Sequence, residues 1–505
     1  MSRCFVPLNV NHDLWDVEPN RGGHMRRKRI RGYELSGDLF IGGERVRASQ
    51  IARYQPSHLD PDTQIDISMA GRYEAGIALD AANSALPKWS SMESSERGQF
   101  LLRLATAISF NVYALTAIEA ISSPFSEEQL HLKVIPELAS AFRAFGEVMQ
   151  SSRKVESLPP FLNEVIYAPV GQVVVFLSSL TPLTEIGEIC APALAAGNTV
   201  VLRTDVSAPL ATSLFMDLVS LCDFPPGVIN WVSGSSESLD NALVASKLTS
   251  RVIVNGSRRE AARLVAVGAA SQKLSLHRNP YAPLIALIDA SVEVDRIAYE
   301  LAQLFNIPQR AMNKPGVRLL AHSDIATQLS EALKSHVLAA RKKYASRAAL
   351  NSRLRVQKFA NLCEYALDDG DQLVFGGRHS EESELWFEPT LILISGATSR
   401  LYVEDFSSPL MTIESYRDFE WVRNRLIGSS ECDTLIAFTT ESSELETLIR
   451  TIPQSRIYVN QLPPVSTASI AYRVEADLES AADRSFKIQS FAQRKDIRAF
   501  LPERY

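Results

Sequence analysis

Cysteine is the residue type in this chain best suited to nucleophilic chemistry, and the sequence holds five of them. A thiolate attacks carbonyl carbons and binds metal ions, so each cysteine is a candidate nucleophile or ligand. The five are scattered, and no two have C-x-x-C spacing: Cys4, Cys190, Cys222, Cys363 and Cys432. Cys190 and Cys222 lie in helix-like stretches, where a packed thiol is the ordinary role. The sequence therefore predicts reduced, structural thiols and no metal site.

The composition limits the class of protein. Of 505 residues, 46% are hydrophobic and 22% are charged, which is enough for a large core and more than one domain. Lysine and arginine number 52 against 58 aspartate and glutamate, for a net charge of −6, which argues against a nucleic-acid or membrane partner. Signal-peptide patterning is absent, and no stretch reaches the roughly 18 to 20 apolar residues of a membrane span. We therefore expect a cytoplasmic protein.

The first residues are polar, and we expect 1–35 to be an N-terminal extension. The extension contains a basic run at 26–31, which is interpreted as a localisation signal, an anion contact or, most commonly for such runs, a solvated stretch. The folded part is predicted to begin with a hairpin over 39–46, turning at Gly42 and Gly43.

Strands and helices alternate along the rest of the chain. Helical spacing predicts one helix over 73–86, interrupted at Pro87, and a second that opens at Ser94. Apolar runs then predict strands at 173–176, 199–202, 228–232 and 251–254, with helices at 185–196 and 238–245. A later set predicts strands at 284–288, 317–320, 391–394, 435–438 and 457–459, with helices at 292–305 and 325–340. This alternation favours parallel sheets covered on both faces, so we expect two α/β domains in series.

Several blocks of this sequence resemble those of aldehyde dehydrogenases and occur in the same order. The most specific are A-P-V-G at 168–171 and A-P-A-L-A-A-G-N-T-V-V-L at 191–202. Further blocks lie at Trp89 with Glu96-Arg97, 208–210, 224–228, 255–257, 387–390, 404–406 with Pro409, and 459–460. The resemblance spans roughly 39–491. It implies an α/β fold with a Rossmann-like dinucleotide domain at 36–150 and 167–274, a catalytic-type α/β domain at 275–470, and a small β oligomerisation arm at 151–166 and 485–500.

The resemblance also locates the catalytic positions of the family. Residues 304–311, L-F-N-I-P-Q-R-A, are similar to the F-x-x-x-G-Q-R-C stretch of the glutamate-semialdehyde branch, which ends in the nucleophilic thiol. Here Ala311 takes that place, and a methyl group cannot form a thiohemiacetal. Leu180 stands where the family has the asparagine that donates to the oxyanion, and Ser275 where it has the general base. His277 and Arg278 replace two glycines beside that base.

The adenosine end of the cofactor site is only partly kept. By resemblance, Arg203 stands where a lysine contacts the ribose, and residues 256–257 match the Gly-Ser pair that receives the pyrophosphate at a helix start. Gly234 belongs to a G-S-S turn in place of G-x-G, and Val206 replaces a glutamate that binds the ribose.

The nicotinamide end is represented by Glu404 and Phe406, which match residues that hold the nicotinamide ribose, although an extra residue before Pro409 shifts the loop. The tentative cofactor set is therefore Arg203, Gly234, Gly256, Ser257, Glu404 and Phe406. Because this set is incomplete, we expect NAD or NADP to bind weakly or not at all.

Three functions remain open. The favoured hypothesis is a catalytically inactive family member, a scaffold or regulatory subunit that forms homo-oligomers or hetero-oligomers with an active paralogue, because three chemical positions are lost together. The alternative is an NAD(P)-dependent aldehyde oxidoreductase with a displaced thiol or a non-covalent hydride transfer. The third is ligand binding or non-redox chemistry by Ser275, His277 or Asn306. A thiol at the mouth of the dinucleotide cleft would contradict the first hypothesis.

Overall fold

The described residues form two compact units, each treated by itself below. The computed structural model describes 27–54, 64–122, 127–148, 154–158, 161–177, 182–206, 209–256, 258–269, 274–278, 283–305, 316–344, 348–349, 353–378, 386–402, 404, 406, 409–429, 432, 434–454, 456–462 and 491–500. Unit 1 falls within Met1–Ser122, Glu127–Arg278 and Arg473–Tyr505. Unit 2 falls within Ser123–Ser126 and Asn279–Tyr472.

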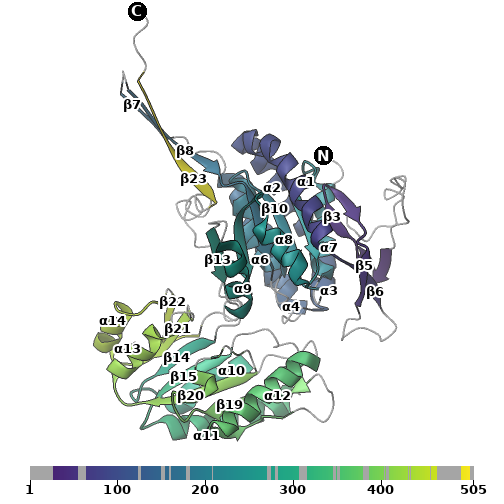
Figure 1. Ribbon diagram of the computed structural model, residues 1–505. Helices are drawn as coiled ribbons and strands as arrows, with labels where there is room; N and C mark the ends of the chain where they lie inside the picture. The colour runs from purple at the N-terminus through teal and green to yellow at the C-terminus, as the bar shows by residue number, and fades with distance from the viewer. Residues whose placement is uncertain are drawn as a thin grey trace, which may run out of the picture. The chain divides into compact units, whose positions relative to one another are not determined.

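Unit 1 is built on a seven-stranded sheet (Figure 1). Its spatial order is β13 (Leu274–Arg278), β12 (Thr249–Asn255), β9 (Gln172–Phe176), β10 (Thr199–Thr204), β11 (Ile229–Ser233), β3 (Leu39–Ile41) and β4 (Glu44–Val46). The strands from β13 to β11 are parallel, and the β3–β4 hairpin adds antiparallel to β11. The chain runs outward from β9 to β11 and then crosses to β12 on the other side of β9. In sheets of this kind, ligands bind at the carboxyl ends of the strands beside such a crossing.

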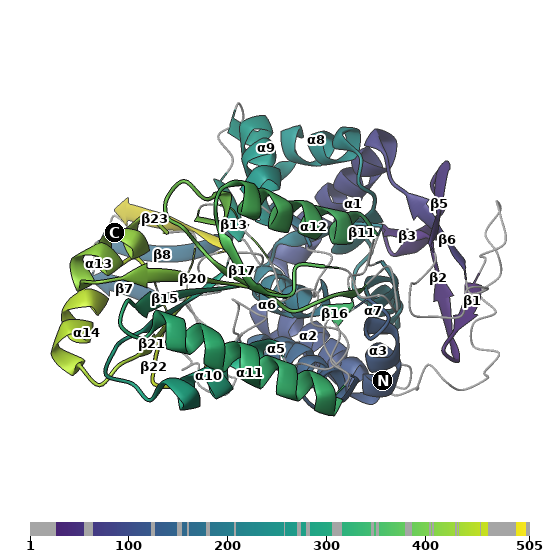
Figure 2. The same cartoon turned by 90° about the horizontal axis from the view of Figure 1, so that it is seen from below.

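Helices cover both faces of this sheet, as Figure 2 shows. One face carries α1 (Arg72–Ser91), α8 (Glu237–Ala245) and α9 (Arg258–Ala269). The other carries α2 (Ser94–Phe110), α5 (Ile135–Val148), α6 (Pro182–Ala195) and α7 (Leu210–Leu221), with α3 (Val112–Glu119), α4 (Glu127–Gln129) and a π-helical turn (Leu130–Val134) beside them. Residues such as Val174 and Val254 pack against Ala78, Leu239 and Leu264 of the first group. Phe176 and Arg203 therefore face α8 and α9, because alternate residues of a strand share a face.

The predicted N-terminal extension is partly folded. Residues 27–30 form β1 (Arg27–Ile30), which pairs with β2 (Tyr33–Ser36) across a turn at Arg31 and Gly32. Arg27 forms an ion pair with Asp217 at 3.3 Å, and Arg31 forms one with Glu127 at 2.7 Å. The solvated-stretch interpretation is therefore wrong for these residues, because acidic partners distant in sequence hold the arginines. A second hairpin, β5 (Gln50–Tyr54) and β6 (Ile65–Met69), follows.

Asn198 joins three segments of unit 1 and explains why the A-A-G-N-T block is needed. Its buried side chain accepts a hydrogen bond from the Gly171 amide at 2.9 Å. It donates to the carbonyls of Ala193 at 2.9 Å and Phe491 at 3.0 Å. Gly197 precedes it with a φ of +92°, a conformation that favours glycine.

We expect Asn198→Ala to lower the free energy of unfolding by about 2–4 kcal/mol, because it leaves one amide and two carbonyls without this partner. Urea denaturation of the purified protein measures the change. The matched control is Asn83→Ala on the exposed face of α1, which should shift stability by less than about 0.5 kcal/mol. Equal effects of the two substitutions would contradict the bridging role.

A three-stranded antiparallel ribbon leaves the body of unit 1 (Figure 1). It consists of β7 (Lys154–Leu158), β8 (Phe161–Pro169) and β23 (Ala492–Phe500), with Ala492 opposite Pro169 and Phe500 opposite Phe161. These strands lie where the resemblance places the arm at 151–166 and 485–500. Their role in oligomerisation stays a prediction.

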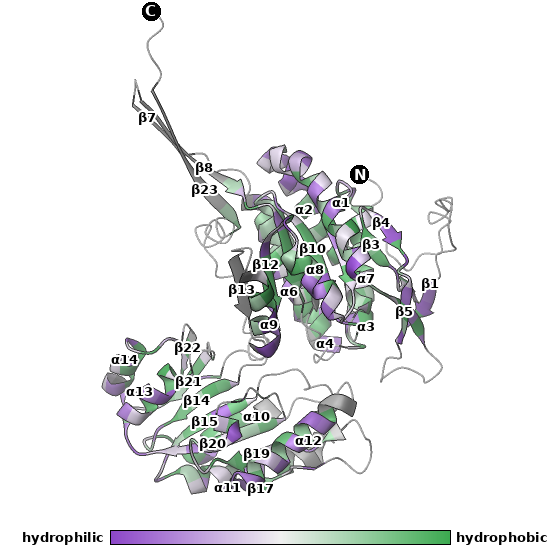
Figure 3. Cartoon of the chain, in the orientation of Figure 1, coloured by the Kyte–Doolittle hydropathy of each residue, from purple (hydrophilic) through white to green (hydrophobic). Residues whose placement is uncertain are grey.

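Unit 2 has its own seven-stranded sheet, whose strands are mostly hydrophobic (Figure 3). Its order is β17 (Gln372–Phe375), β19 (Thr390–Leu393), β20 (Leu410–Tyr416), β15 (Val317–His322), β14 (Leu284–Ile288), β21 (Thr434–Phe438) and β22 (Arg456–Val459). Only β17 is antiparallel to its neighbour in this described sheet. A short pair, β16 (Ala348–Ala349) and β18 (Trp386–Phe387), and a 3-10 turn (Arg400–Tyr402) lie outside it.

Separate hydrophobic cores lie on the two faces of this second sheet. One contains α10 (Val294–Phe305) and α11 (Ala326–Tyr344). The others contain α12 (Arg353–Asp368), and α13 (Phe419–Ile427) with α14 (Ser442–Ile449). The predicted α/β fold is thus confirmed in both units.

Among the described helices, no single one is long and apolar enough to cross a membrane. Helices α2 and α3 meet the length and composition criteria only as a pair, which is bent by 72° between them.

Two predicted boundaries differ from the structure. Helix α1 continues through Pro87. Proline has no N–H to donate to the carbonyl of Asn83, four residues earlier, but both residues lie on the exposed face of the helix, where water can bond that carbonyl. Strand β13 pairs with β12, Ser275 opposite Val252, so unit 1 extends to Arg278 rather than ending at residue 274. The strand pairing decides the second boundary, and no local sequence pattern reports it.

Candidate active and cofactor site

The described cysteines are all buried. They are Cys190 in α6, Cys222 after α7, Cys363 in α12 and Cys432 before β21, and none is in a disulfide. Burial raises the pKa of Cys190 far above its usual range and that of Cys363 to about 12. A thiol in such an environment is protonated at neutral pH and is a poor nucleophile. All four described thiols are thus buried, and Cys4 lies outside the described part of the chain.

The three chemical positions are only partly described. Ala311 and Leu180 lie outside the described residues, as do Ser257 and Asn306. Ser275 lies in β13, and the backbone of His277 is opposite Val254 in the same ladder. Within the described ranges, no three His, Cys, Asp or Glu side chains are grouped so that they could hold a metal ion.

Arg203 lies near the carboxyl end of β10, where the resemblance expects a ribose contact. Its guanidinium is buried and donates to Asp240 of α8 through two bonds, Nε to Oδ1 at 3.0 Å and Nη2 to Oδ2 at 3.2 Å. Its other face lies over the ring of Phe176. Arg263 of α9 donates to the same carboxylate at 2.6 Å. The carboxylate of Asp240 in α8 thus binds the guanidinium groups of Arg203, from β10, and Arg263, from α9.

A second carboxylate lies over Gly256, at the start of α9. A Cβ atom added to Gly256 would lie 2.3 Å from Oε2 of Glu260, so that carboxylate fills the space above the glycine. Arg203 Nη1 is 4.0 Å from Glu260 Oε1. Burial raises the pKa of Glu260, while the positive charge of Arg203 acts in the opposite direction.

This arrangement does not fit a dinucleotide as it stands. A pyrophosphate needs bare glycine backbone and open N–H groups at the helix start. Here an acidic side chain covers Gly256, and Asp240 engages the guanidinium of Arg203. The prediction from sequence found these two positions but missed Asp240, Glu260 and Arg263. The only available signal was the spacing S-x-x-E at 257–260, which is typical of a helix capping box.

Gly234 has a packing role that differs from the predicted cofactor contact. Its amide donates to the Thr204 carbonyl at 3.0 Å. An added Cβ would lie 2.7 Å from Leu239 Cδ2 and 2.9 Å from the Ala70 carbonyl oxygen. A side chain at Gly234 would therefore separate β11 from α8, which explains the glycine without a nucleotide.

Asn255 is a polar group that sequence reasoning did not single out as a site residue. It ends β12, is 2% exposed, and neither atom of its amide group has a hydrogen-bond partner among the residues that the structure describes. Leaving such an amide unpaired costs about 1–3 kcal/mol. Because it lies at the carboxyl edge of the sheet, beside the crossing from β9 to β12, Asn255 is a candidate ligand contact.

In unit 2, Arg318 holds the loop that carries Glu404 and Phe406. Arg318 lies in β15 and is 1% exposed. It donates to the carbonyl oxygens of Leu401 at 2.6 Å, Tyr402 at 2.5 Å and Glu404 at 2.6 Å. Its guanidinium lies 5.1 Å from the centre of the Phe406 ring. Phe406 is consequently a core residue, while the Glu404 side chain is exposed.

Arg425 of α13 supports the same loop. It donates to the Tyr402 carbonyl at 2.8 Å and forms two bonds with Glu414 of β20, at 2.7 and 2.9 Å. Glu414 is also 3.9 Å from Arg318. One buried carboxylate thus compensates two buried arginines, which is how charges are retained in a protein interior.

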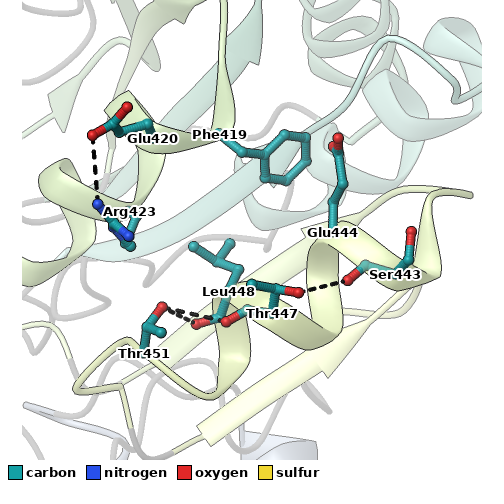
Figure 4. A pocket seen from close by; sticks show the side chains of 8 residues that line it. All are labelled: Phe419, Glu420, Arg423, Ser443, Glu444, Thr447, Leu448 and Thr451. Atoms are coloured by element: carbon teal, nitrogen blue, oxygen red, sulfur yellow. Dashed lines mark hydrogen bonds and ion pairs between the residues drawn. The ribbon is translucent and has the colours of Figure 1, made fainter.

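A pocket of about 540 Å³ lies between α13 and α14 (Figure 4). Its lining combines the apolar Phe419 and Leu448 with polar side chains: Glu420, Arg423, Ser443, Glu444, Thr447 and Thr451. Thr447 and Thr451 bond to carbonyls of their own helix, and Arg423 pairs with Glu420 at 3.6 Å. None of the predicted site residues lines it.

Comparison with known proteins decides the family. Residues 45–472 match the model described as "Aldehyde dehydrogenase family". The chain belongs to the aldehyde dehydrogenase family. It is 26% identical over 414 residues to betaine aldehyde dehydrogenase of Bacillus subtilis (strain 168), covering 77% of this chain and 82% of that protein. It is also 26% identical over 406 residues to aldehyde dehydrogenase B of Escherichia coli (strain K12), covering 76% and 78%.

Solved aldehyde dehydrogenases share the fold. Betaine aldehyde dehydrogenase from Staphylococcus aureus in complex with NAD+ has a TM-score of 0.80 at 17% identity, covering 93% of this chain and 96% of that one. A putative aldehyde dehydrogenase from Burkholderia cenocepacia has a TM-score of 0.78 at 23% identity, covering 93% and 98%. The membership predicted from the sequence blocks is confirmed, and the glutamate-semialdehyde branch stays a prediction.

Proposed function

We propose that this aldehyde dehydrogenase family member does not oxidise aldehydes through a cysteine and serves as a non-catalytic subunit. The observation that carries the proposal is the burial of every described thiol, together with Ala311 at the position of the nucleophile. Leu180 and Ser275 remove the oxyanion amide and the base in addition. Covalent aldehyde oxidation needs a thiol that attacks the aldehyde and a donor that stabilises the resulting oxyanion. It also needs a base that activates water to hydrolyse the acyl group.

A second candidate is an NAD(P)-dependent aldehyde oxidoreductase with an atypical site, and the comparisons favour it. The relatives are named as dehydrogenases, and a solved structure with the same fold contains NAD+. The unpaired amide of Asn255 at the carboxyl edge supports ligand binding there. Such a candidate would need a base on this chain that takes a proton from a hydrated aldehyde, and the nicotinamide, when bound, would supply the hydride acceptor, so that no thioester is required.

Incubating the purified protein with NAD+ or NADP+ and a panel of aldehydes tests both candidates. We expect no reduced cofactor above the buffer rate, measured at 340 nm, and the same result after all five cysteines are replaced with serine. The Bacillus subtilis betaine aldehyde dehydrogenase is the positive control. Turnover that survives the five replacements would establish the non-covalent candidate, and turnover that they abolish would establish a displaced thiol.

The proposed cofactor and partner properties follow from the same site. We propose that NAD and NADP bind weakly, because the Glu260 carboxylate covers Gly256 and Asp240 accepts hydrogen bonds from the Arg203 guanidinium.

We also propose assembly through the ribbon of β7, β8 and β23, with another copy or with an active paralogue. In the described ribbon, β7 and β23 are edge strands, and an edge strand can pair with a strand of another chain. Light scattering of the purified chain, and co-purification with a co-expressed paralogue, test the assembly. A chain that stays monomeric in both experiments would refute it.

A further inference from the structure

We propose that the Glu260 carboxylate occupies the anion position at the start of α9 and thereby excludes phosphate-bearing ligands from the carboxyl edge of the first sheet. Glu260 is then a residue that determines ligand specificity by competing with the ligand from within the chain. The inference rests on the weak dinucleotide binding proposed above and names the side chain responsible for it.

The first step is the place of the carboxylate. Glu260 is the third residue of α9, which begins at Arg258. The N–H groups at the start of a helix and the helix dipole attract an anion, whether a side chain or a phosphate. Oε2 of Glu260 lies where a side chain on Gly256 would begin, 2.3 Å from the added Cβ. A phosphate that approaches the Gly256 backbone must displace this carboxylate first.

The second step is the charge around Glu260. Two arginines, Arg203 and Arg263, are near it, but Asp240 accepts hydrogen bonds from both. Asp205 adds a third negative charge in the neighbourhood. Arg258 and Arg259 precede Glu260 in the first turn of α9. A pyrophosphate at Gly256 would lie beside the Glu260 carboxylate itself, and like charges at such a distance repel.

The third step is why removal of the carboxylate opens the site. Arg203 and Arg263 stay held by Asp240 when Glu260 is shortened. The space over Gly256 that Oε2 of Glu260 fills is then vacated, and no carboxylate of residue 260 competes with a phosphate there. The loss of a favourable acid at the helix start lowers the stability of the chain only slightly, which a chain with a core of this size can tolerate.

The test compares Glu260→Ala and Glu260→Gln with the parent protein by calorimetric titration with NAD+, NADP+ and ADP. The matched control is Glu237→Ala, which removes an exposed acid from the first turn of α8. We expect millimolar or weaker binding by the parent protein and the control, and at least tenfold tighter binding by Glu260→Ala. A gain in Glu260→Gln assigns the exclusion to charge, and a gain in Glu260→Ala alone assigns it to bulk.

The outcomes separate this inference from the proposal on which it rests. If the parent binds NAD+ weakly and both Glu260 variants, folded by circular dichroism, bind no more tightly, the inference fails and weak binding stands. If the parent binds NAD+ at micromolar concentration and the variants do not differ from it, both fail. If the parent binds tightly and Glu260→Ala binds tighter still, weak binding fails and the competition by Glu260 stands.

Discussion

Replacing Arg318 with methionine is expected to lower the free energy of unfolding of unit 2 by about 3–5 kcal/mol, one of the two largest effects predicted for this chain. Methionine matches the length of the side chain but donates no hydrogen bond. Three carbonyls, those of Leu401, Tyr402 and Glu404, lose their shared donor. Glu414 loses one of two nearby positive charges in a buried environment.

Urea denaturation, followed by hydrogen exchange of β15 and of residues 400–406, measures this effect. Exchange should accelerate most at the loop, because Arg318 is the side chain that binds it to the sheet. The matched control is Arg296→Met in α10, which removes a half-exposed pair with Glu300 and should cost less than about 0.5 kcal/mol. A loss below about 1 kcal/mol for Arg318→Met would show that the loop is held by its packing alone.

Glu119 is expected to make unit 1 less stable as the pH rises. It ends α3, is 1% exposed, and its Oε2 has no hydrogen-bond partner within the described ranges of the chain. Burial, and secondarily the buried carboxylate of Glu185, raise the pKa of Glu119 to about 8 from an ordinary value of 4.5. Tyr54 also faces this group, and burial raises its pKa, with Glu119 as the second cause.

The sign follows from proton binding. Between pH 4.5 and about 8, the folded state keeps the proton on Glu119, while the unfolded state has released it. Stability therefore falls as the pH rises through this window. The full loss is on the order of 5 kcal/mol when the pKa shift from 4.5 to about 8 is converted at about 1.4 kcal/mol per unit.

Melting temperatures measured from pH 5 to pH 8.5 test this prediction. The parent should lose stability across the range, and Glu119→Gln should lose much less, because a neutral amide has no charge to bury. The control is Glu96→Gln on the exposed face of α2, which should follow the parent. Parallel curves for the parent protein and Glu119→Gln would mean that Glu119 is already ionised in the folded state.

Much of the fold was predictable because each apolar run in the sequence corresponds to one strand, and each stretch with helical periodicity corresponds to one helix. The run at 284–288 is β14 with the same limits, and the runs at 317, 391, 435 and 457 each fall in a strand of the same sheet. Strand β20 was missed, although it lies between β19 and β15. Its sequence L-M-T-I-E-S-Y contains Glu414, which is tolerated in a buried strand because Arg425 donates to it and Arg318 lies 3.9 Å away. A pairing between residues of different elements leaves no local pattern.

The site was predictable at the level of positions but not of contacts. The resemblance placed Arg203 and Gly256 at the sheet edge, and the structure has them there. The resemblance did not show that Asp240 and Glu260 engage this edge, because both are ordinary helix residues in the sequence. Their contacts depend on how α8 and α9 pack on the sheet, and the sequence of either helix alone does not report that packing.

The bond from Asn198 to Phe491 joins residues 293 positions apart. The residues of unit 2 lie between two segments of unit 1 in the sequence. All of unit 2 is therefore translated before the segment of unit 1 that contains Phe491 and β23. At 5–20 residues per second, a ribosome needs roughly 15–60 s to make that interval. The first-made half must wait with one of the three hydrogen bonds of the Asn198 side chain unmade and with β8 lacking one neighbour. Chaperone binding during synthesis should therefore concentrate on unit 1 until the last strand emerges.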